Sequence, residues 1–456
     1  MVPVNVPQQY IGNRFAYNNG TAQLSLCPPY APARPHLGTP DCLESMLVRF
    51  RSAYLQRAAA PLLAAIVVLA VLLGPAPARA AVLDGDYVDG VTVGTDASLR
   101  DVSIDVYIPA GVLQTSDGRE LWARGPEERR AMASTTKIMT AVIVLERSSL
   151  DESVTIGTVD LRPDESSMGL RKGERVTVRD LLEGMLIASG NDAATALAQQ
   201  VAGDVPSFVK LMNDKAKALD LANTHYADPE GLDAPGHYTS AEDLTSLARY
   251  AMRFPEFRRI VATPKAIVRS DKYTHVLKST DQMLGQPGGF EGVKTGNTKN
   301  AGYCFVAAAK RGDVELYATV MGAATESGRF GQALKVIEWG FAHYKSTQVS
   351  TAGDHLGRIR VSDYMERTVA VETGETTSTP VFDITGPVRR RVQLPADVAA
   401  PVKRGQRIGT VTLFQGDKLL AQVPAVASAD IPVPTFGQRA TFFFGRIWNW
   451  VIGKKQ

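Results

Sequence analysis

The sequence predicts an α+β protein that continues into a small all-β domain. Between residues 134 and 253, apolar side chains repeatedly recur every three or four positions, as they do on one face of a helix. Residues 289–324 instead form apolar runs separated by turn residues, a pattern typical of antiparallel strands. From about residue 350 the chain consists of short β-like runs with Gly and Pro turns.

Composition narrows the classes of function. The chain has 456 residues, enough for two or three domains of ~150 residues each. Its net charge of +3 is too small to indicate nucleic-acid binding, and no basic run alternates with aromatic residues. The six histidines are scattered and the three cysteines have no zinc-site spacing, so we expect no metal and no cofactor.

An export signal is predicted in residues 46–80. The apolar run 58–73 follows Arg51 and Arg57 and is followed by a small-x-small site that ends at Ala80. These features are typical of a secretory signal peptide with cleavage after Ala80. The alternative is an uncleaved membrane anchor, although the run is shorter than the ~20 apolar residues that a spanning helix needs.

The segments on either side of this signal are less regular. Residues 1–45 are polar and rich in turn-forming residues, and Met46 would give the signal peptide a normal basic start. We therefore expect either translation from Met46 or a disordered N-terminal extension. Residues 81–107 form a separate N-terminal segment of the mature chain. Cys304 would be the one cysteine after cleavage, in a run that reads as a buried strand.

The first elements of the mature domain are a hairpin and a helix. Residues 111–124 form two apolar runs joined through Asp117-Gly118, a favoured tight turn. A helical pattern begins at Ser134, and a serine at that place is the usual N-cap. Thr177 is expected to cap the helix that follows it, and two more helices are predicted in 192–202 and 205–221.

The second half of this domain contains a helix, three strands and a further helix. Residues 237–253 predict a helix capped by Thr239 or Ser240. Turn chemistry then divides residues 289–324 into three antiparallel strands. The closing helix has an expected apolar stripe: Phe330, Leu334, Ile337 and Phe341.

Two further segments complete the chain. Residues 350–430 predict the small β domain, with Gly416-Asp417 as a hairpin turn. Residues 435–456 predict an amphipathic helix that is aromatic on one side and basic at its ends. Such a helix is typical of a membrane interface, and docking on the β domain is the alternative.

Three short motifs carry the chemistry. They follow one another in the order Ser134-Thr135-Thr136-Lys137, Ser189-Gly190-Asn191 and Lys294-Thr295-Gly296. Ser134 at a helix start can act as a nucleophile, and Lys137 lies one turn later on the same face. Lys137 can take a proton only when neutral, and we expect burial and the second ammonium of Lys294 to lower its pKa.

The other motif residues have matching expected roles. Ser189 can relay a proton to the leaving amine, and Asn191 can hold Lys137 and a substrate amide. Lys294 and Thr295 on a strand can bind a carboxylate or carbonyl, and Gly296 lets the substrate backbone approach. The N–H groups of Ser134 and Asn297 are the expected oxyanion hole. Ser207 and Lys210 repeat the first motif within an amphipathic helix and are interpreted as surface residues.

The chain resembles the low-molecular-mass D-alanyl-D-alanine carboxypeptidases, serine-type penicillin-binding proteins of peptidase family S11. The segments "MASTTKIMTAVIVLE", "LLEGMLIASGNDAATALA", "ADPEGLD" and "GFEGVKTGNTKNAGYC" carry the resemblance within residues 108–345, the expected catalytic domain. It implies the penicillin-recognising β-lactamase/transpeptidase-like α/β fold, an antiparallel sheet flanked by helices with a helical lobe. It also implies removal of D-alanine from peptidoglycan stem peptides, acylation by β-lactams, and Arg329 as a carboxylate-binding residue.

The sequence leaves other functions open beside that of a D-alanyl-D-alanine carboxypeptidase. Asn297 stands where the family more often has an aromatic residue or histidine, which affects substrate preference. A β-lactamase would need an added deacylating base, and no Glu-x-x-Leu-Asn segment has the right spacing. An endopeptidase, a transpeptidase and a non-enzymatic sensor of penicillin or cell wall are further alternatives. The expected location is the outer face of the cytoplasmic membrane, with peripheral anchoring through residues 435–456.

Overall fold

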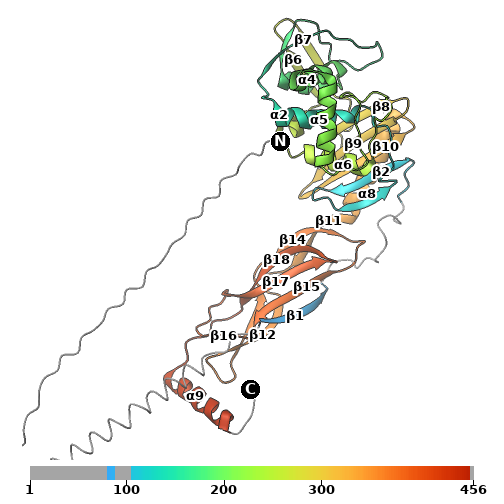
Figure 1. Cartoon of the computed structure of the whole chain (residues 1–456). Helices are drawn as coiled ribbons and strands as arrows, with labels where there is room; N and C mark the ends of the chain where they lie inside the picture. Colours follow the sequence, from blue (N-terminus) through green and yellow to red (C-terminus); the bar gives the residue numbers. More distant parts are fainter. Residues whose placement is uncertain (1–79, 88–103, 452–456) are drawn as a thin grey trace, which may run out of the picture. The chain divides into compact units, whose positions relative to one another are not determined.

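The computed structural model describes residues 80–87 and 104–451. The predictions for residues 1–45 and for the apolar run of the signal segment lie outside these residues. One compact unit begins at Ala78 and includes all the elements below. Figure 1 shows the elements along the chain.

A five-stranded antiparallel sheet forms the centre of the expected catalytic domain, with strand order β3-β2-β10-β9-β8. Its strands are β2 (Ala110–Thr115), β3 (Glu120–Arg124), β8 (Phe290–Thr298), β9 (Gly302–Arg311) and β10 (Val314–Ala323). The predicted hairpin and the three predicted strands are therefore confirmed. Strand β8, which contains the third motif, lies at an edge of the sheet, so one side of its backbone is not paired within the sheet.

The strands are buried on both faces, and the side chains alternate between two hydrophobic cores. On β9, Cys304 and Val306 belong to one core, while Phe305 and Ala307 belong to the other. This follows from the two-residue period of a strand. Cys304 is fully buried, as expected. Helix α8 (Glu326–His343) covers the face of Phe305, and α6 (Ala241–Ala251) packs on the opposite face (Figure 1).

The stripe predicted for the closing helix is confirmed, although its residues differ in depth. Phe330 and Ile337 of α8 are buried, and Leu334 and Phe341 are half-buried against the same core. Ala333, Val336 and Gly340 form the rest of the buried face. Gly340 fits closely there, because a Cβ would come within 2.7 Å of Leu316 Cδ1 and 2.8 Å of Leu113 Cδ2, so that these side chains would have to shift. Small residues let the helix lie close to the sheet, which a count of large apolar residues does not reveal.

The helical lobe is built around α2 (Lys137–Arg147) and contains the first two motifs. The other elements of this lobe are the 3₁₀ turn η2 (Ala133–Thr136), α3 (Val178–Ile187), α4 (Asn191–Ala202), α5 (Val205–Ala218), α7 (Pro255–Val261) and the short strands β4 (Ser153–Thr155), β5 (Arg175–Thr177), β6 (Lys265–Arg269) and β7 (Thr274–Lys278). Thr177 caps α3 in a capping box with Asp180, and Ser240 caps α6. Both caps were predicted, and each is worth about 1 kcal/mol.

The C-terminal region is a β domain with its own core. Its strands are β11 (Tyr344–Ser350), β12 (His355–Val361), β13 (Thr368–Thr373), β14 (Thr377–Phe382), β15 (Val388–Pro395), β16 (Asp397–Val398), β17 (Arg407–Gln415) and β18 (Lys418–Ala427). The turn at Gly416-Asp417 joins β17 to β18, as predicted. Strands β11 and β14 pair with each other, and the other strands, together with β1 (Ala80–Tyr87), form a seven-stranded sheet of order β1-β15-β17-β18-β13-β12-β16. Its edge strand β1 pairs with β15 and comes from the N-terminal segment of the chain.

The chain ends in helix α9 (Phe436–Val451). Thr435 and Gln438 bond each other's backbone N–H groups at its start. Its aromatic side chains are largely exposed, with 61% exposure for Phe443, 67% for Phe444 and 65% for Trp448. Of the helices within 104–451, none combines the length and apolar character required to cross a bilayer.

Candidate active site

Ser134 lies in the 3₁₀ turn η2, directly before α2. The prediction that it caps the helix is wrong, because no side chain makes a capping bond at the start of η2 or α2. The hydroxyl is instead directed to a side chain, since Ser134 Oγ accepts a bond of 2.9 Å from Lys137 Nζ. The backbone before it is unusual, with a φ of 50° at Ala133. For a residue with a side chain this conformation is costly and must be held by its surroundings.

Two glycines hold that turn in place by close approach. A Cβ on Gly296 would lie 2.9 Å from the carbonyl oxygen of Met132 and 3.1 Å from Ser134 N. A Cβ on Gly231 would lie 2.0 Å from the carbonyl oxygen of Ala133. The contacts of 2.9 Å and 2.0 Å with backbone oxygens are shorter than a Cβ allows. Gly296 of the third motif therefore has a role beyond substrate approach, because it lets β8 pack against the serine turn.

Lys137 connects the first two motifs. It is fully buried, and its Nζ lies 2.9 Å from Ser134 Oγ, 2.7 Å from Asn191 Oδ1 and 2.7 Å from the carbonyl oxygen of Glu230. An ammonium has three donors, and these three oxygens use all of them. A neutral amine would keep two of these bonds as donor, and its lone pair could then accept the hydroxyl proton of Ser134.

The orientation of Asn191 depends on an acidic residue that the sequence motifs did not include. Asn191 Nδ2 donates to Glu165 Oε2 at 2.9 Å, which leaves Oδ1 directed at Lys137. Asp192, the next residue in the chain, receives the backbone N–H groups of Met168, Gly169 and Leu170, each at 3.0 Å. These bonds hold the loop before β5, which contains Glu165, against the start of α4. The position of Asp192 beside the second motif was the one sequence signal available for this contact.

A second buried lysine lies on β8. Lys294 Nζ donates to Ser189 Oγ and to the carbonyl oxygen of Thr295, both at 3.0 Å. Ser189 has a φ of 61°, a left-handed conformation that directs its side chain from the end of α3 into the site. Burial, followed by repulsion from the Lys137 cation, holds the pKa of Lys294 well below its ordinary value. Lys294 and Ser189 are therefore placed to move a proton between them.

The remaining predicted residues surround the third motif. Arg329 Nη1 donates to the carbonyl oxygen of Gly296 at 3.2 Å, and Asn297 is exposed. Thr295 Oγ1 bonds Thr280 Oγ1 at 2.6 Å. The structure thus brings all nine candidate residues to one region, where the serine turn, the start of α4, strand β8 and the first turn of α8 meet.

The pKa of Lys137 is set by burial and by nearby carboxylates, and not by the expected repulsion from Lys294. Burial lowers the pKa of Lys137 to about 8, while nearby carboxylates oppose this, Glu230 first. Burial also raises the pKa of Glu230 to about 7. The carboxyl of Glu230 accepts a bond from Thr195, and its backbone oxygen holds Lys137. The repulsion between the two ammonium groups lowers the pKa of Lys294, since Lys137 is surrounded by acidic groups.

Replacing the carboxylate of Glu230 tests this balance. In Glu230→Gln, loss of the negative charge should lower the pKa of Lys137 further, so that Lys137 is neutral at lower pH. The rise of the acylation rate with pH should move down by about 1 pH unit. Stopped-flow acylation by a fluorescent penicillin between pH 6 and 10 measures this. Asp214→Asn, which removes an exposed carboxylate paired with Lys210, is the control. An unshifted profile in Glu230→Gln would contradict the assignment.

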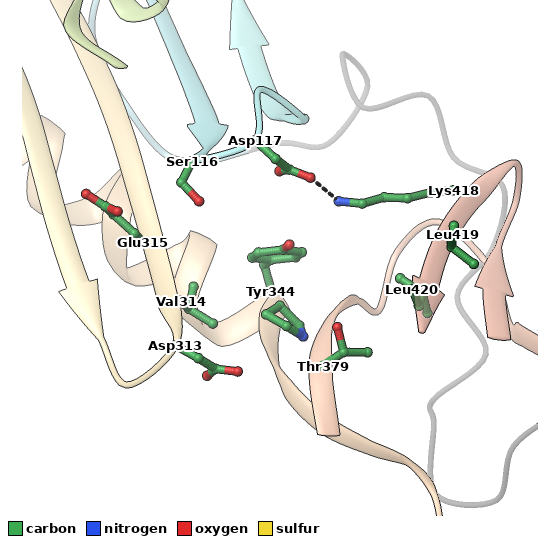
Figure 2. Close-up of a pocket in the computed structure, with 11 residues that line it drawn as sticks. Ser116, Asp117, Asp313, Val314, Glu315, Tyr344, Thr379, Lys418, Leu419 and Leu420 are labelled. Atoms are coloured by element: carbon green, nitrogen blue, oxygen red, sulfur yellow. Dashed lines mark hydrogen bonds and ion pairs between the residues drawn. The ribbon is translucent and has the colours of Figure 1, made fainter. Parts of the chain in front are cut away.

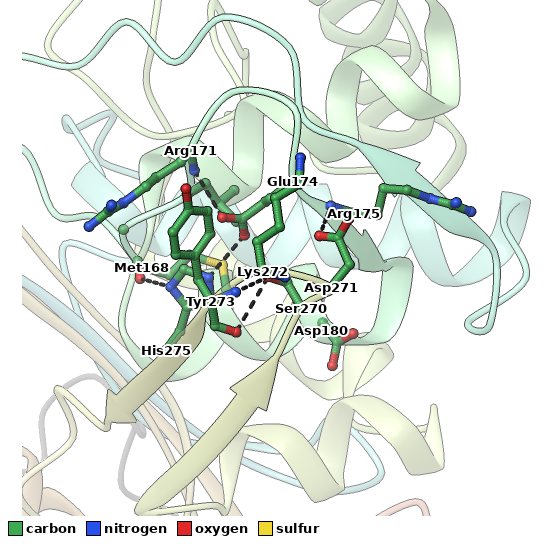
Figure 3. A network of polar contacts seen from close by, with 12 residues as sticks. Met168, Arg171, Glu174, Arg175, Asp180, Ser270, Asp271, Lys272, Tyr273 and His275 are labelled. Carbon is green, nitrogen blue, oxygen red and sulfur yellow. Dashed lines mark hydrogen bonds and ion pairs between the residues drawn. The ribbon is translucent and has the colours of Figure 1, made fainter.

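A polar network near this site links the loop before β5 to the hairpin of β6 and β7 (Figure 3). Glu174 is fully buried and lies 2.9 Å from His275 Nε2, while its other oxygen accepts the N–H of Arg171 at 3.2 Å. His275 Nδ1 lies 3.1 Å from the carbonyl oxygen of Met168. The network therefore holds the same loop that Asp192 holds from the other side.

The second S-x-x-K sequence has ordinary surface chemistry. Ser207 and Lys210 are exposed on α5, and Lys210 pairs with Asp214 at 2.6 Å. The interpretation of these residues as surface residues is confirmed. No group of three or more His, Cys, Asp or Glu side chains in 104–451 is placed to hold a metal ion.

A cavity of about 310 Å³ is lined by residues outside the three motifs. Figure 2 shows this cavity. Its lining includes the β2–β3 turn, the start of β10 and Tyr344, and the ion pair of Asp117 and Lys418 spans 2.6 Å beside it. None of the nine candidate residues lines this cavity. The chemistry therefore belongs to the motif region and not to this cavity.

Comparison with known proteins agrees with this arrangement. The family model of D-alanyl-D-alanine carboxypeptidase, peptidase S11, matches residues 105–325, and that of the penicillin-binding protein 5 C-terminal domain matches residues 344–433. D-alanyl-D-alanine carboxypeptidase DacF of Bacillus subtilis is 31% identical over 351 residues, which are 75% of this chain and 89% of DacF.

Two solved structures extend the comparison to the fold. Penicillin-binding protein 5 from Haemophilus influenzae is 29% identical, with a TM-score of 0.54, and covers 73% of this chain and 99% of its own. The Streptomyces K15 DD-transpeptidase is 34% identical, with a TM-score of 0.51, over 53% of this chain and 99% of its own. The sheet, the helical lobe and the C-terminal β domain thus form the penicillin-binding-protein fold, and the chain belongs to the D-alanyl-D-alanine carboxypeptidase family of serine peptidases, peptidase S11.

Proposed function

We propose that this protein removes the terminal D-alanine from peptidoglycan stem pentapeptides through an acyl-enzyme on Ser134. The observation that carries the proposal is the position of Lys137, whose Nζ reaches Ser134 Oγ, Asn191 Oδ1 and the carbonyl oxygen of Glu230. This arrangement gives the serine a buried base with a fixed direction. The family's activity and its acylation by penicillins are consistent with the same serine.

Acylation follows from this geometry. Neutral Lys137 takes the proton of Ser134 while Oγ attacks the carbonyl carbon of the penultimate D-alanine. The N–H groups of Ser134 and Asn297 stabilise the resulting oxyanion. The proton taken by Lys137 passes by way of Ser189, which is bonded to Lys294, to the leaving amine as the C–N bond breaks and an ester forms, and Lys137 is neutral again. In deacylation Lys137 takes a proton from the attacking water and returns it to Ser134 Oγ as the ester C–O bond breaks.

Substrate binding uses the free edge of the sheet. An extended peptide can pair with β8 as an added strand, because β8 has no neighbour on that side within the sheet. Lys294 and Arg329 lie at this strand and supply positive charge for the terminal carboxylate of the peptide. Asn297 is exposed beside them and is positioned to affect which stem peptide is preferred.

The test is product analysis with a defined stem pentapeptide. A carboxypeptidase releases free D-alanine and leaves a tetrapeptide. Transfer of the acyl group to an added amine would instead indicate a transpeptidase, the activity named for the similar Streptomyces K15 protein. Cleavage of cross-linked dimers would indicate an endopeptidase. Rapid turnover of penicillin without a lasting adduct would indicate a β-lactamase and would contradict the proposal.

We also infer export and peripheral membrane attachment. The segment 46–80 has the features of a signal peptide, which supports a location on the outer face of the cytoplasmic membrane. Helix α9 presents Phe443, Phe444 and Trp448 to solvent, and large exposed aromatic side chains in a helix with basic residues favour the membrane interface. A stable aqueous helix would bury most of this surface.

Removal of residues 435–456 should release the signal-processed enzyme from membranes. Without the exposed aromatic face, binding to vesicles that contain anionic lipid should fall by at least about tenfold. Penicillin acylation should stay within about twofold of the full chain, because none of the nine candidate residues lies in 435–456. Vesicle sedimentation together with penicillin labelling measures both. Unchanged sedimentation of the truncated, processed form would contradict the role of α9.

A further inference from the structure

Asp281 is a buried acidic residue that the mechanism above does not use. It lies in the loop between β7 and β8 and is 7% exposed. Its Oδ1 accepts the N–H of Met283 at 2.8 Å. Its Oδ2 is buried and has no hydrogen-bond partner among residues 104–451. An unpaired buried carboxylate oxygen is costly, so its presence beside the third motif calls for a physical explanation.

The loop of Asp281 is attached to the active site on both sides. The preceding residue, Thr280, bonds Thr295 Oγ1 at 2.6 Å, and its N–H donates to the carbonyl oxygen of Ile187 at 3.2 Å. Thr295 belongs to the third motif, and Ile187 ends the helix before the second. Asp281 is therefore held in place relative to both motifs.

The charged groups that face Asp281 come from two elements. Lys294 on β8 and Arg329 on α8 both interact electrostatically with its carboxyl. Glu326 on α8 lies next, 3.1 Å from Arg329 Nη2, and its side chain is 56% exposed. Arg329 also lies over the ring of Tyr303 on β9, at 5.6 Å from the ring centre.

Arg329 has an unpaired group of its own. Its Nη1 and Nη2 are bonded, but its buried Nε lacks a partner within the described part of the chain. Asp281 therefore lies near Lys294 and Arg329, the two cations proposed to bind the substrate carboxylate. Within the described residues, Asp281 Oδ2 and Arg329 Nε both lack a hydrogen-bond partner.

We propose that Asp281 is a positioning residue for recognition of the substrate carboxylate, and that it takes up a proton when an anionic substrate binds. In the free enzyme its negative charge balances Lys294 and Arg329. An incoming substrate carboxylate neutralises the same two cations. Two buried anions beside these cations repel each other, so one of them takes up a proton. The inference rests on the proposed function, since it assumes that these cations bind the carboxylate.

The protonation equilibrium is suited to this role. Burial raises the pKa of Asp281 to about 6, while the Met283 N–H and the two cations oppose the rise. At neutral pH the carboxyl is therefore mostly ionised in the free enzyme. A bound anion raises its pKa, so binding is coupled to proton uptake. By linkage, an anionic ligand binds more tightly below pH 6, where Asp281 is already neutral, than at pH 8.

The test compares Asp281→Asn with wild type in acylation by benzylpenicillin, whose carboxylate stays ionised over the range used. Asn retains an oxygen for the Met283 N–H and removes the charge. The ratio of the second-order rate constants, mutant to wild type, should be near 1 at pH 5 and rise to about 3–10 at pH 8. Both enzymes contain Lys137, so the effect of Lys137 protonation on the acylation rate cancels in this ratio. Asp271→Asn, an exposed acidic residue of the β6–β7 hairpin, should give a flat ratio.

A second measurement needs no variant. Acylation by penicillin is itself proton-neutral, because the serine proton passes to the β-lactam nitrogen as the C–N bond breaks and the ester forms. Wild-type enzyme mixed with benzylpenicillin in weak buffer should take up a fraction of a proton between pH 6 and 7, and less at pH 5 and pH 8. A flat ratio for Asp281→Asn, or no uptake at any pH, would overturn the inference. Absence of D-alanine release with these results intact would instead count against the proposed function alone.

Discussion

Ser134→Ala should abolish both penicillin labelling and D-alanine release. The hydroxyl is the atom that forms the ester, and no other group in the site is placed to replace it. Loss of a serine nucleophile lowers the rate by about 10⁴-fold to 10⁶-fold, which is below detection in a gel-labelling assay. Fluorescent penicillin labelling and D-alanine release from a pentapeptide measure the two reactions. The fold should persist, because the side chain is partly exposed and makes one bond, to Lys137.

The matched control is Ser207→Ala. Ser207 belongs to the other S-x-x-K sequence and is exposed on α5. Its backbone N–H, which the substitution leaves in place, donates to Asp204 Oδ1. Its removal should leave labelling unchanged. If Ser134→Ala still labels with a correctly folded enzyme, Ser134 is not the nucleophile.

Lys137→Met should have the next largest effect. Methionine fills most of the space of the lysine but cannot accept a proton. Loss of a positioned general base lowers the rate by about 10²-fold to 10⁴-fold, so labelling should become slow and not disappear. The variant should also be less stable, because Asn191 Oδ1 and the carbonyl oxygen of Glu230 lose a buried donor, at about 1–3 kcal/mol each. Stopped-flow acylation and thermal unfolding measure the two effects.

The pH dependence of the wild-type acylation rate also tests the role of Lys137 as the base. Lys137 is an effective base only when neutral, and its pKa is lowered by burial to about 8. The acylation rate of wild type should therefore rise as pH increases through about 8, and this rise should be absent in Lys137→Met. Lys210→Ala, which removes an exposed lysine paired with Asp214, should retain both rate and profile. A variant at Lys137 that acylates at the wild-type rate would exclude it as the base.

Features that depend on local chemistry were predictable from sequence. The cap at Thr177, the hairpin turns at Asp117-Gly118 and Gly416-Asp417, and the three central strands all follow from short-range rules. The order of the three motifs identified seven of the nine candidate residues, because each motif contributes a chemical group that the others need. Asn297 directly follows the third motif, and Arg329 was expected from the family resemblance alone.

Features that depend on distant contacts were not predictable. Glu165 and Asp281 have no local pattern that marks them, yet each is bonded at the site. Glu230 lies in the segment "ADPEGLD", but nothing local indicated that its backbone oxygen would hold Lys137. The capping role expected for Ser134 failed for the same reason. A short-range rule assigns a helix-start serine to the backbone, whereas here a buried lysine takes its oxygen and Gly231 and Gly296 admit the strained turn.

The sequence alone therefore determined the kinds of groups in the active site and the elements that contain them, because helix periodicity, turn residues and motif order are written in neighbouring positions. The tertiary structure decided which protonation states those groups can adopt. Burial and the sum of surrounding charges set the pKa of Lys137, Lys294 and Asp281. These quantities arise only when segments more than 50 residues apart, such as Lys137 and Asn191, are brought into contact.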